Sequence, residues 1–401
     1  MGNGLPKFPD ADRCNGCQAC VSVCPAGALR MVPDAEGFAH PQVDDGKCLG
    51  CGKCVRTCPV LSPPGGQPAR KAWSAVSTRR EEVMRSSSGA IFQLLASKIL
   101  AAGGVVFGAR FDGEFNVVLD SCEDLAGLVA FQGSKYLQSS ANGVYSRAEA
   151  YLNAGRTVLF SGTPCQIAAL RKVLGGNDWG EKLITVGVIC HGAPSPLIWQ
   201  EFRQARESVA GAATTTANFR DKCLSWLDFS MTMTFANGGR YSCILKHDPY
   251  IRGFLQHLFL RPSCHACQFR DPNWTQDITL ADFWKVKKLL PQMYEPKGGV
   301  SLVFAHSDLG ERLLESVSGE IERIEVPLEA SMASNPASMV SAAVSPYRRA
   351  FWEDHGKYPL LKLLRWYNYR RWWKTVINMF PEWRRRQISR QIPDSRPKGK
   401  H

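Results

Sequence analysis

Two closely spaced runs of cysteine near the start of the chain constrain its structure more than any other feature. Each run has the form Cys-x2-Cys-x2-Cys-x3-Cys-Pro, the first beginning at Cys14 and the second at Cys48. This spacing is typical of segments that bind 4Fe–4S clusters through their thiolates. A zinc site is the alternative, but zinc sites rarely use four cysteines within a run of 11 residues. The two runs therefore predict two four-iron clusters.

In the bacterial ferredoxin pattern, the fourth cysteine of each run binds the cluster of the other run. This rule predicts that the runs exchange Cys24 and Cys58. The first expected ligand set is Cys14, Cys17, Cys20 and Cys58, and the second is Cys48, Cys51, Cys54 and Cys24. Residues 1–66 are accordingly predicted to form a ferredoxin-like domain of the α+β class, and the Pro- and Gly-rich segment 62–68 predicts its boundary.

The rest of the chain has the composition of a folded protein. Of the 401 residues, 44% are hydrophobic and 21% are charged, which excludes a disordered chain, a collagen and a small disulfide scaffold. No export signal and no uninterrupted apolar stretch of about 18 residues is visible, so no membrane span is expected. Cysteines in metal-type spacing without an export signal predict a cytoplasmic protein.

From residue 71 onward the pattern is that of an α/β domain. Short apolar runs predict buried strands, and longer runs with helical spacing predict the helices that cover them. Strands are expected at 71–77, 105–111, 156–160 and 182–189, and helices at 91–102 and 166–174. A hairpin is expected between 227–235 and 240–245, across Asn237-Gly-Gly239.

Seven cysteines lie outside the two runs, and four of them are candidates for a third site. Cys165 and Cys190 each follow a predicted strand, where open α/β sheets bind ligands. Cys264 and Cys267 form the only close pair among the seven. The four would supply the thiolates of a third 4Fe–4S cluster, and the alternative from spacing alone is that they are buried packing residues. The remaining three are interpreted as packing residues: Cys122, Cys223 and Cys243.

Six further motifs follow one another along the chain. They are Ser86-Ser-Ser-Gly-Ala90, Gly133-Ser-Lys-Tyr136, Ser161-Gly-Thr-Pro-Cys-Gln-Ile167, Cys190-His-Gly192, Cys264-x2-Cys267 and Asp277-Ile-Thr-Leu-Ala-Asp-Phe-Trp284. By these motifs, residues from about 73 to 334 resemble the coenzyme F420 hydrogenase/dehydrogenase beta-subunit family, which includes chlorophyll-cycle 7-hydroxymethyl reductases. With the cysteine runs, the resemblance extends over most of the chain.

The resemblance implies an oxidoreductase with an α/β flavin-binding domain. It implies FAD beside an iron–sulfur cluster, which favours the third cluster, and electron exchange between a hydride-carrying small molecule and a redox partner protein or ferredoxin. Residues 71–155 and 156–340 would be the N-terminal and C-terminal parts of the beta subunit, the second part holding the flavin and the third cluster. The hydride donor stays open between coenzyme F420 and another reductant.

The resemblance also implies where the flavin lies. Free backbone N–H groups in a turn that opens a helix suit a pyrophosphate, although Ser88 would equally serve as an ordinary helix N-cap. The candidate flavin residues are Ser86, Ser87, Ser88, Gly89, Gly133, Ser134, Lys135, Tyr136, Gly162, Thr163 and Pro164. The candidate catalytic residues are Lys135, His191 and Asp282. The alternatives are a solvated side chain for Lys135 and, for His191, an imidazole bonded to nearby backbone.

The chain departs from the family pattern at one loop. The family's Gly-Asp-Phe-Trp-Gly is replaced by Ala281-Asp-Phe-Trp-Lys285. Losing both glycines removes backbone freedom and adds a charge, so the loop contacts or the donor are expected to differ. Two alternatives to an enzyme stay open: a non-catalytic electron-transfer subunit that serves a separate enzyme, and a flavin-less scaffold in a biosynthetic complex.

Residues 345–401 form a basic, aromatic tail. It holds 15 Lys or Arg against four Asp or Glu, a balance of +11 out of a total of +13. A helix is expected over 362–379, either packed on the body or lying against an anionic membrane surface or an acidic partner. Stacking on nucleic acid is the third interpretation, but no nucleic-acid partner is expected, because the rest of the chain is nearly neutral.

Overall fold

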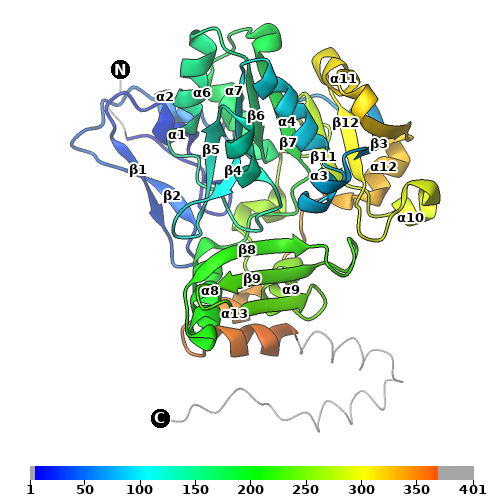
Figure 1. Ribbon diagram of the computed structural model, residues 1–401. Coiled ribbons are helices and arrows are strands. Elements are labelled where there is room, and N and C mark those ends of the chain that lie inside the picture. Colours follow the sequence, from blue (N-terminus) through cyan, green and yellow to red (C-terminus); the bar gives the residue numbers. More distant parts are fainter. Residues whose placement is uncertain (1–4, 369–401) are drawn as a thin grey trace, which may run out of the picture.

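The computed structural model describes residues 5–368, and its larger part is built on one eight-stranded sheet (Figure 1). The strands are β3 (Lys71–Ser77), β4 (Val105–Phe111), β5 (Val117–Cys122), β6 (Val158–Gly162), β7 (Leu183–Val188), β11 (Ile278–Asp282), β12 (Ser301–Ala305) and β13 (Ile321–Glu325). Their order is β13-β3-β12-β11-β7-β6-β4-β5. The neighbours β11, β7, β6 and β4 are parallel, and the outer pairs are antiparallel. The segments after β6, β7 and β11 therefore meet at one edge of the sheet.

Helices cover both faces of this sheet. They are α3 (Arg80–Arg85), α4 (Ile91–Ala101), α5 (Leu125–Leu128), α6 (Val144–Asn153), α7 (Pro164–Val173), α10 (Val286–Leu289), α11 (Asp308–Glu315) and α12 (Leu328–Ser334). Leu94 of α4 and Ile184 of β7 belong to one buried cluster. Tyr145 of α6, Phe160 of β6 and Ile167 of α7 belong to another. A sheet covered on both faces explains why its inner strands read as continuous apolar runs.

A smaller, three-stranded antiparallel sheet lies beside the large one (Figure 1). Its strands, in spatial order, are β10 (Arg240–Ile244), β9 (Ser230–Phe235) and β8 (Thr214–Asp221), and its helices are α8 (Pro196–Ala210), α9 (Pro249–Leu255) and α13 (Arg348–Asp354). Trp199 of α8, Phe219 of β8 and Tyr250 of α9 meet in its aromatic core. This core holds α8 and α9 against the small sheet.

The described part of the basic tail packs on this smaller sheet. Phe351 of α13 is fully buried, and Leu363 and Leu364, within the helical residues 360–368, enter the same core. Packing on the body is therefore the correct interpretation for the tail up to residue 368. The rest of the predicted helix 362–379, and of the tail, lies outside the described residues.

The cysteine-rich N-terminal segment forms a small unit docked on the large sheet (Figure 1). It contains α1 (Ala19–Ser22), α2 (Lys53–Arg56) and the antiparallel strands β1 (Leu29–Pro33) and β2 (Ala39–Val43). Tyr145 Oη donates a 2.9 Å hydrogen bond to the carbonyl of Cys17, and Gln18 Nε2 donates to Ser140 Oγ over 3.1 Å. These bonds fix the first cysteine run against the body.

Most of the expected elements are present. The predicted strands 71–77 and 105–111 coincide with β3 and β4, and the hairpin forms as β9 and β10. Helix α7 begins at Pro164, two residues earlier than predicted, because Thr163 N donates a 3.0 Å hydrogen bond to Gln166 Oε1 and caps it. The mixed α/β class is confirmed. The antiparallel strands β5, β12 and β13 were not predicted. Strands β12 and β13 pair with β3, far away in sequence, and nothing local marks that pairing, whereas β5 forms a hairpin with the preceding strand β4.

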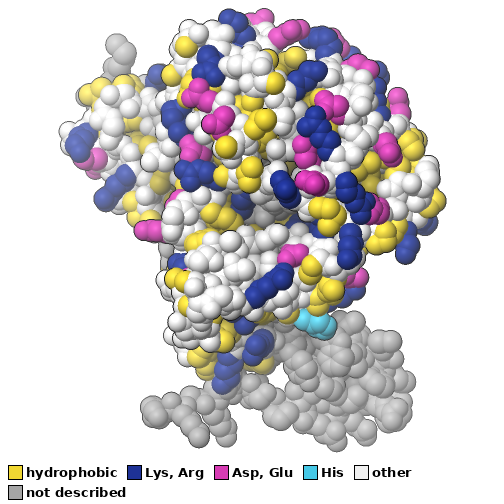
Figure 2. Space-filling view, viewed as in Figure 1, with side chains coloured by type: hydrophobic (Ala, Val, Ile, Leu, Met, Phe, Trp, Pro, Cys, Tyr) yellow, Lys and Arg dark blue, Asp and Glu magenta, His cyan; other side chains and the backbone are white. Residues whose placement is uncertain are grey.

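The surface of the body carries mixed charge. In Figure 2, Lys and Arg side chains are interspersed with Asp and Glu over the larger part. Pairs such as Arg70 with Asp308 and Lys71 with Glu311, both at 2.6 Å, account for part of this mixture. Within residues 5–368, no helix combines the length and the apolar character that crossing a membrane requires.

Candidate metal centres and flavin site

Two cavities in the N-terminal unit each collect four cysteines from both runs. The lining of the first cavity includes Cys14, Cys17, Cys20 and Cys58. The lining of the second includes Cys24, Cys48, Cys51 and Cys54. We call these the middle group and the outer group. The fold thus exchanges Cys24 and Cys58 between the runs, in the arrangement that the spacing predicts.

Each of these groups offers the four thiolates that one 4Fe–4S cluster binds. One sulfur also accepts a hydrogen bond, because Ala28 N lies 3.3 Å from Cys24 Sγ. Such bonds help to set the potential of a cluster.

A third group of cysteines gathers at the carboxyl edge of the large sheet. Cys165 lies in the first turn of α7, directly after β6, and Cys190 follows β7. Cys264 and Cys267 come from the 3₁₀ turn Pro262–Ala266 and the residue after it. We call these four cysteines the inner group. Parallel neighbouring strands place the first two side by side, which is what the sheet rule predicts.

Burial controls the protonation of the inner group. It raises the pKa of Cys165, Cys190 and Cys264 to about 12, and the negative charge of neighbouring cysteines adds to each shift. Four thiolates in such a medium need compensating positive charge, which iron ions supply. Two sulfurs also contact donors: Ala193 N lies 3.3 Å from Cys264 Sγ, and Thr163 Oγ1 lies 3.2 Å from Cys165 Sγ. The donor set therefore fits a cluster.

The three groups follow one another from the surface to the sheet edge. Cys51 of the outer group is exposed. Burial raises the pKa of Cys20 in the middle group to about 12, and the charge of Cys54 from the outer group contributes to that shift. Burial likewise raises the pKa of Cys17, with a contribution from Cys165 of the inner group. The middle group therefore adjoins both of the others.

Apolar side chains fill the space between the middle and inner groups. Cys58 shares a buried cluster with Ala168 and Phe269, and Cys165 and Cys267 pack against it. Apolar side chains therefore lie where the two groups meet.

The candidate flavin turns lie side by side. Ser86 ends α3, and Ser87 Oγ accepts hydrogen bonds of 2.7 and 2.8 Å from the N–H and the hydroxyl of Ser134. Gly133, directly before it, has φ +77, a conformation that glycine adopts without strain. The structure therefore brings together two turns that are 47 residues apart in sequence.

Ser88 does not cap the following helix. Its hydroxyl donates a 2.8 Å hydrogen bond to the carbonyl of Val300, and the N-cap of α4 is Ala90, at φ 64. Gly89 N donates to Ser301 Oγ over 3.0 Å. The turn is thus anchored to β12 rather than serving as an ordinary cap.

A buried ion pair lies between β8 and β11. Arg220 is 3% exposed, and its Nη1 donates to Asp282 Oδ2. The guanidinium lies over the rings of Trp284 and Phe229, at 4.9 and 4.6 Å. Trp226 stacks on Trp284 at 5.6 Å and donates from Nε1 to Asp282 Oδ1 over 3.3 Å. The Arg220 guanidinium also interacts with the hydroxyl of Tyr136. A buried guanidinium held in this way suits an anionic ligand.

Two polar groups flank this pair. Lys222 Nζ donates to the carbonyls of Val83 and Gly298, the second at 2.6 Å. Burial, together with the charge of Arg220, lowers the pKa of Lys222 to about 7. Burial raises the pKa of Tyr136, against the opposing effect of the Arg220 charge. Trp226 Nε1 also donates to the carbonyl of Ser87 over 3.1 Å, so the pair adjoins the serine turns.

The other two candidate catalytic side chains are bound within the protein. Lys135 Nζ donates to the carbonyls of Ala130 and Gln132, at 3.0 and 2.8 Å, and burial lowers its pKa to about 7. His191 Nε2 lies 2.9 Å from His257 Nε2, and burial lowers the pKa of His191 to about 4. The partner of His191 is thus a second imidazole rather than the backbone.

Aromatic rings connect the inner group with the Arg220 region. The ring of His191, next to Cys190, contacts Phe254 edge-on at 5.1 Å, and Phe254 stacks on Tyr136 at 5.0 Å. The remaining candidates, Gly162–Pro164, form the turn from β6 into α7, where Thr163 contacts the sulfur of Cys165. That turn therefore serves the inner group directly.

Comparisons with known proteins agree with this architecture. A model of the 4Fe-4S dicluster domain matches residues 13–61. The family model for the C terminus of the coenzyme F420 hydrogenase/dehydrogenase beta subunit matches residues 155–327. Residues 155–327, less than half of the chain, are thus similar to this beta-subunit family, and they follow a segment similar to a dicluster domain.

One solved structure is similar to part of this chain. A chain of the F420-reducing NiFe hydrogenase complex from Methanosarcina barkeri is 18% identical, with a TM-score of 0.47, over 71% of this chain and 98% of that chain. Among curated proteins, none matches this sequence.

The structure accommodates the departure of the chain from the beta-subunit pattern. Ala281 lies within β11, paired with Leu302, and Lys285 has φ −96, so neither position needs glycine. Lys285 Nζ donates to the carbonyl of Ala333 over 2.8 Å. The new charge is therefore bound beside α12, and Asp282 still reaches Arg220.

Sequence reasoning missed three residues of these sites and misread one. Arg220 and Lys222 stand in a charged run that is usually a solvated loop, and nothing local shows that both are buried. Arg261, three residues before Cys264, carried no signal except that proximity. Cys223 is exposed, so its interpretation as a packing residue is wrong.

Proposed function

We propose that the protein is an iron–sulfur flavoprotein oxidoreductase. It exchanges a two-electron hydride equivalent with a small-molecule donor or acceptor, and single electrons with a redox partner protein. When bound, FAD supplies the conversion between two-electron and one-electron chemistry, and 4Fe–4S clusters supply the one-electron steps. The outer, middle and inner groups would hold three such clusters.

The observation that carries this proposal is the order of the three cysteine groups. The outer group reaches the surface at Cys51, and the inner group lies at the sheet edge that also carries Asp282. A one-electron partner docks at the first end, and a hydride donor binds at the second. Apolar packing around Cys58 and Cys165 lies where adjacent groups meet.

The residues around Arg220 fit the flavin. The guanidinium of Arg220 would bind a phosphate oxygen of FAD, while Asp282 and Tyr136 hold it in place. Trp226 and Trp284 exclude water from the same region. The linked turns at Ser87 and Ser134 then define the adjoining wall.

One observation favours the non-catalytic alternative. Lys135, His191 and Asp282 each bind other protein groups, and a structural role explains these contacts without any proton transfer. An electron-transfer subunit that serves a separate enzyme needs no such group. Whether the purified chain alone oxidises a hydride donor distinguishes the two functions.

The first experiment measures iron, sulfide and flavin on one anaerobically purified sample. Three four-iron clusters and one FAD require about 12 irons and one flavin per chain. About eight irons without flavin would contradict the enzyme and leave a dicluster module on an inert body. Exchange of Cys165→Ser should remove about four irons, whereas Cys122→Ser, in the core between β5 and α4, should remove none.

A second pair of variants tests the flavin site. Arg220→Gln should lower the flavin content while the iron content stays unchanged. Arg206→Gln is the matched control, because Arg206 is also buried and stacks on Tyr241 at 4.0 Å within the smaller sheet. Equal flavin in both variants would place the flavin elsewhere.

A further inference from the structure

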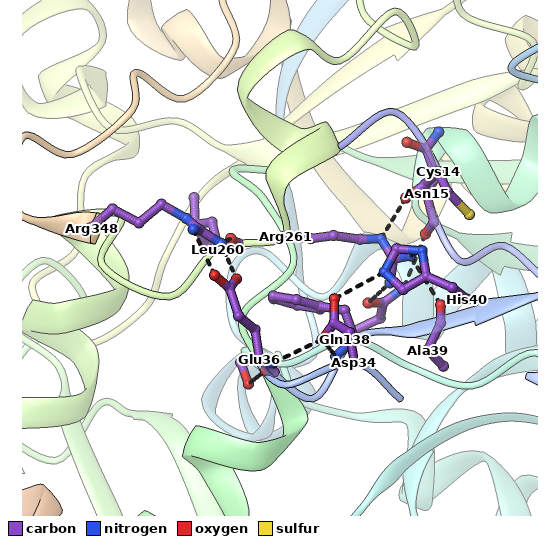
Figure 3. A network of polar contacts seen from close by, with 12 residues as sticks. Cys14, Asn15, Asp34, Glu36, Ala39, His40, Gln138, Leu260, Arg261 and Arg348 are labelled. Carbon is purple, nitrogen blue, oxygen red and sulfur yellow. Dashed lines mark hydrogen bonds and ion pairs between the residues drawn. The ribbon is translucent and has the colours of Figure 1, made fainter. Parts of the chain in front are cut away.

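Arg261 is a buried cation that joins the N-terminal unit to the body. It is 1% exposed, and its Nε donates a 2.6 Å hydrogen bond to the carbonyl of Cys14 (Figure 3). Its Nη1 donates to Gln138 Oε1 over 2.9 Å, and its Nη2 donates to the carbonyl of Ala39 over 3.0 Å. The ring of Phe38 lies 5.4 Å from the guanidinium carbon. Each of the three guanidinium nitrogens thus binds a different segment of the chain.

The main chain of Arg261 binds the loops that carry the inner group. Its N–H donates to the carbonyl of Ala193 over 2.8 Å, and its own carbonyl accepts a 2.9 Å bond from Cys264 N–H. Ala193 N in turn lies 3.3 Å from Cys264 Sγ. One residue therefore contacts the middle group with its side chain and the inner group with its backbone.

The charge of Arg261 has no carboxylate partner within residues 5–368. The acidic residues in Figure 3 are paired elsewhere, Asp34 with His40 at 3.1 Å and Glu36 with Arg348. The acceptors around the guanidinium are carbonyl and amide oxygens, with His40 Nδ1 at 3.4 Å. An unneutralised charge in a buried setting acts over a longer range than one in water.

This charge lies between two groups of thiols. The guanidinium binds the carbonyl of Cys14 in the middle group. The main chain of the same residue binds Cys264 N–H and Ala193, whose own N–H contacts Cys264 Sγ. The positive charge is therefore placed next to cysteines on both sides of the boundary between unit and body.

We propose that Arg261 is a positioning residue that raises the reduction potentials of the middle and inner clusters together. A fixed positive charge favours the reduced, more negative state of each neighbouring cluster. The guanidinium of Arg261 also holds the N-terminal unit in place. The docking of that unit and the reduction potentials of the middle and inner clusters therefore depend on one side chain. The inference rests on the clusters of the proposed function and on none of its flavin chemistry.

The test is a redox titration of the anaerobic full-length holoprotein, followed by electron paramagnetic resonance. Arg261→Gln should shift the midpoint potentials of two clusters to more negative values and leave the third unchanged. Arg261→Lys, which keeps the charge, should shift them less. Arg206→Gln removes a buried arginine that acts on none of the three groups, and should shift none. Cys51→Ser, which perturbs only the outer cluster, identifies the signal that must stay in place.

Two results would overturn the inference: unchanged potentials in an iron-replete Arg261→Gln protein, or equal shifts in the glutamine and lysine variants. If Arg261→Gln does not retain its iron, Gln138→Glu decides the question. It places a carboxylate beside Nη1 with almost no change in volume, so the same two potentials should fall. Unchanged potentials there would also overturn the inference. Absence of flavin would contradict the flavoprotein and leave this test intact.

Discussion

At the scale of single residues, buried charge is what most distinguishes this protein. Arg220 and Asp282 form a nearly dry pair, and Lys222 lies two residues away with only carbonyls as partners. A buried pair contributes little net stability, but removing one partner leaves the other uncompensated. Such groups are retained where an incoming ligand needs them, which agrees with an anion site at Arg220.

Exchange of Asp282→Asn should therefore destabilise the protein strongly. The Arg220 charge would stay buried without its partner, at a cost of about 3–5 kcal/mol in the free energy of unfolding. Asp308→Asn is the control, because its pair with Arg70 is exposed and should contribute little to stability. Urea unfolding under anaerobic conditions measures both. Similar midpoints for the two variants would contradict the role of burial.

Lys222 should give the stability a specific pH dependence. Burial lowers its pKa from 10.5 to about 7, so between these values the unfolded chain holds a proton that the folded protein lacks. The free energy of unfolding therefore rises as the pH increases from 7 toward 10.5. Lys222→Met lacks this contribution. The difference in urea midpoint, wild type minus variant, should grow with pH, and parallel curves would refute the assignment.

At the scale of elements, the β1–β2 hairpin docks the N-terminal unit on the body. Gly37 in its turn has φ +82, and a Cβ there would lie 2.5 Å from Leu197 Cβ of α8. Ser195 Oγ donates a 2.5 Å bond to the carbonyl of Glu36 in the same turn. The turn thus fits against the start of α8 only because Gly37 has no side chain.

Exchange of Gly37→Ala should loosen this docking. The left-handed backbone costs alanine about 1 kcal/mol, and the clash with Leu197 adds to that. Gly27→Ala is a matched control, because Gly27 has φ +58 but nothing within 4 Å of its Cβ position. Limited proteolysis within linker residues 62–66 should be faster in Gly37→Ala than in Gly27→Ala. Equal rates would show that backbone strain alone matters.

At the scale of the whole molecule, the cysteine groups differ in their access to solvent. The outer group includes the exposed Cys51, whereas Cys14 and Cys58 of the middle group are buried. Oxidants and chelators reach a cluster through its exposed ligands. If the protein holds the three clusters of the proposed function, they should consequently be lost in a fixed order.

On brief exposure to air, one third of the iron should leave the protein first. This fraction belongs to the outer cluster, and a slower phase should release the rest. Timed iron release, with cluster signals recorded on the same samples, measures both phases. Covering the outer group by a bound partner should slow only the first phase. A single phase would mean that the groups are equally accessible.

The sequence predicted those features whose signal lies within a short stretch of residues, and it missed those that depend on contacts between distant residues. The cysteine runs carry their ligand assignment in their spacing, and the apolar runs of β3 and β4 carry their strand assignment. Arg220 could not be predicted, because its partner Asp282 lies 62 residues away and its burial depends on Trp226 and Trp284. The inner group was suggested by strand ends and the family resemblance, since only the folded sheet brings Cys165 and Cys264 together.

The exchange of Cys24 and Cys58 also affects how the protein is made. A ribosome releases the chain from its N-terminus, and neither half of the cysteine repeat contains a complete ligand set. The outer set is complete when Cys54 emerges and the middle set when Cys58 follows, whereas the inner set waits for Cys267. A nascent chain therefore offers the ligands of the first two groups about 200 residues before those of the inner group.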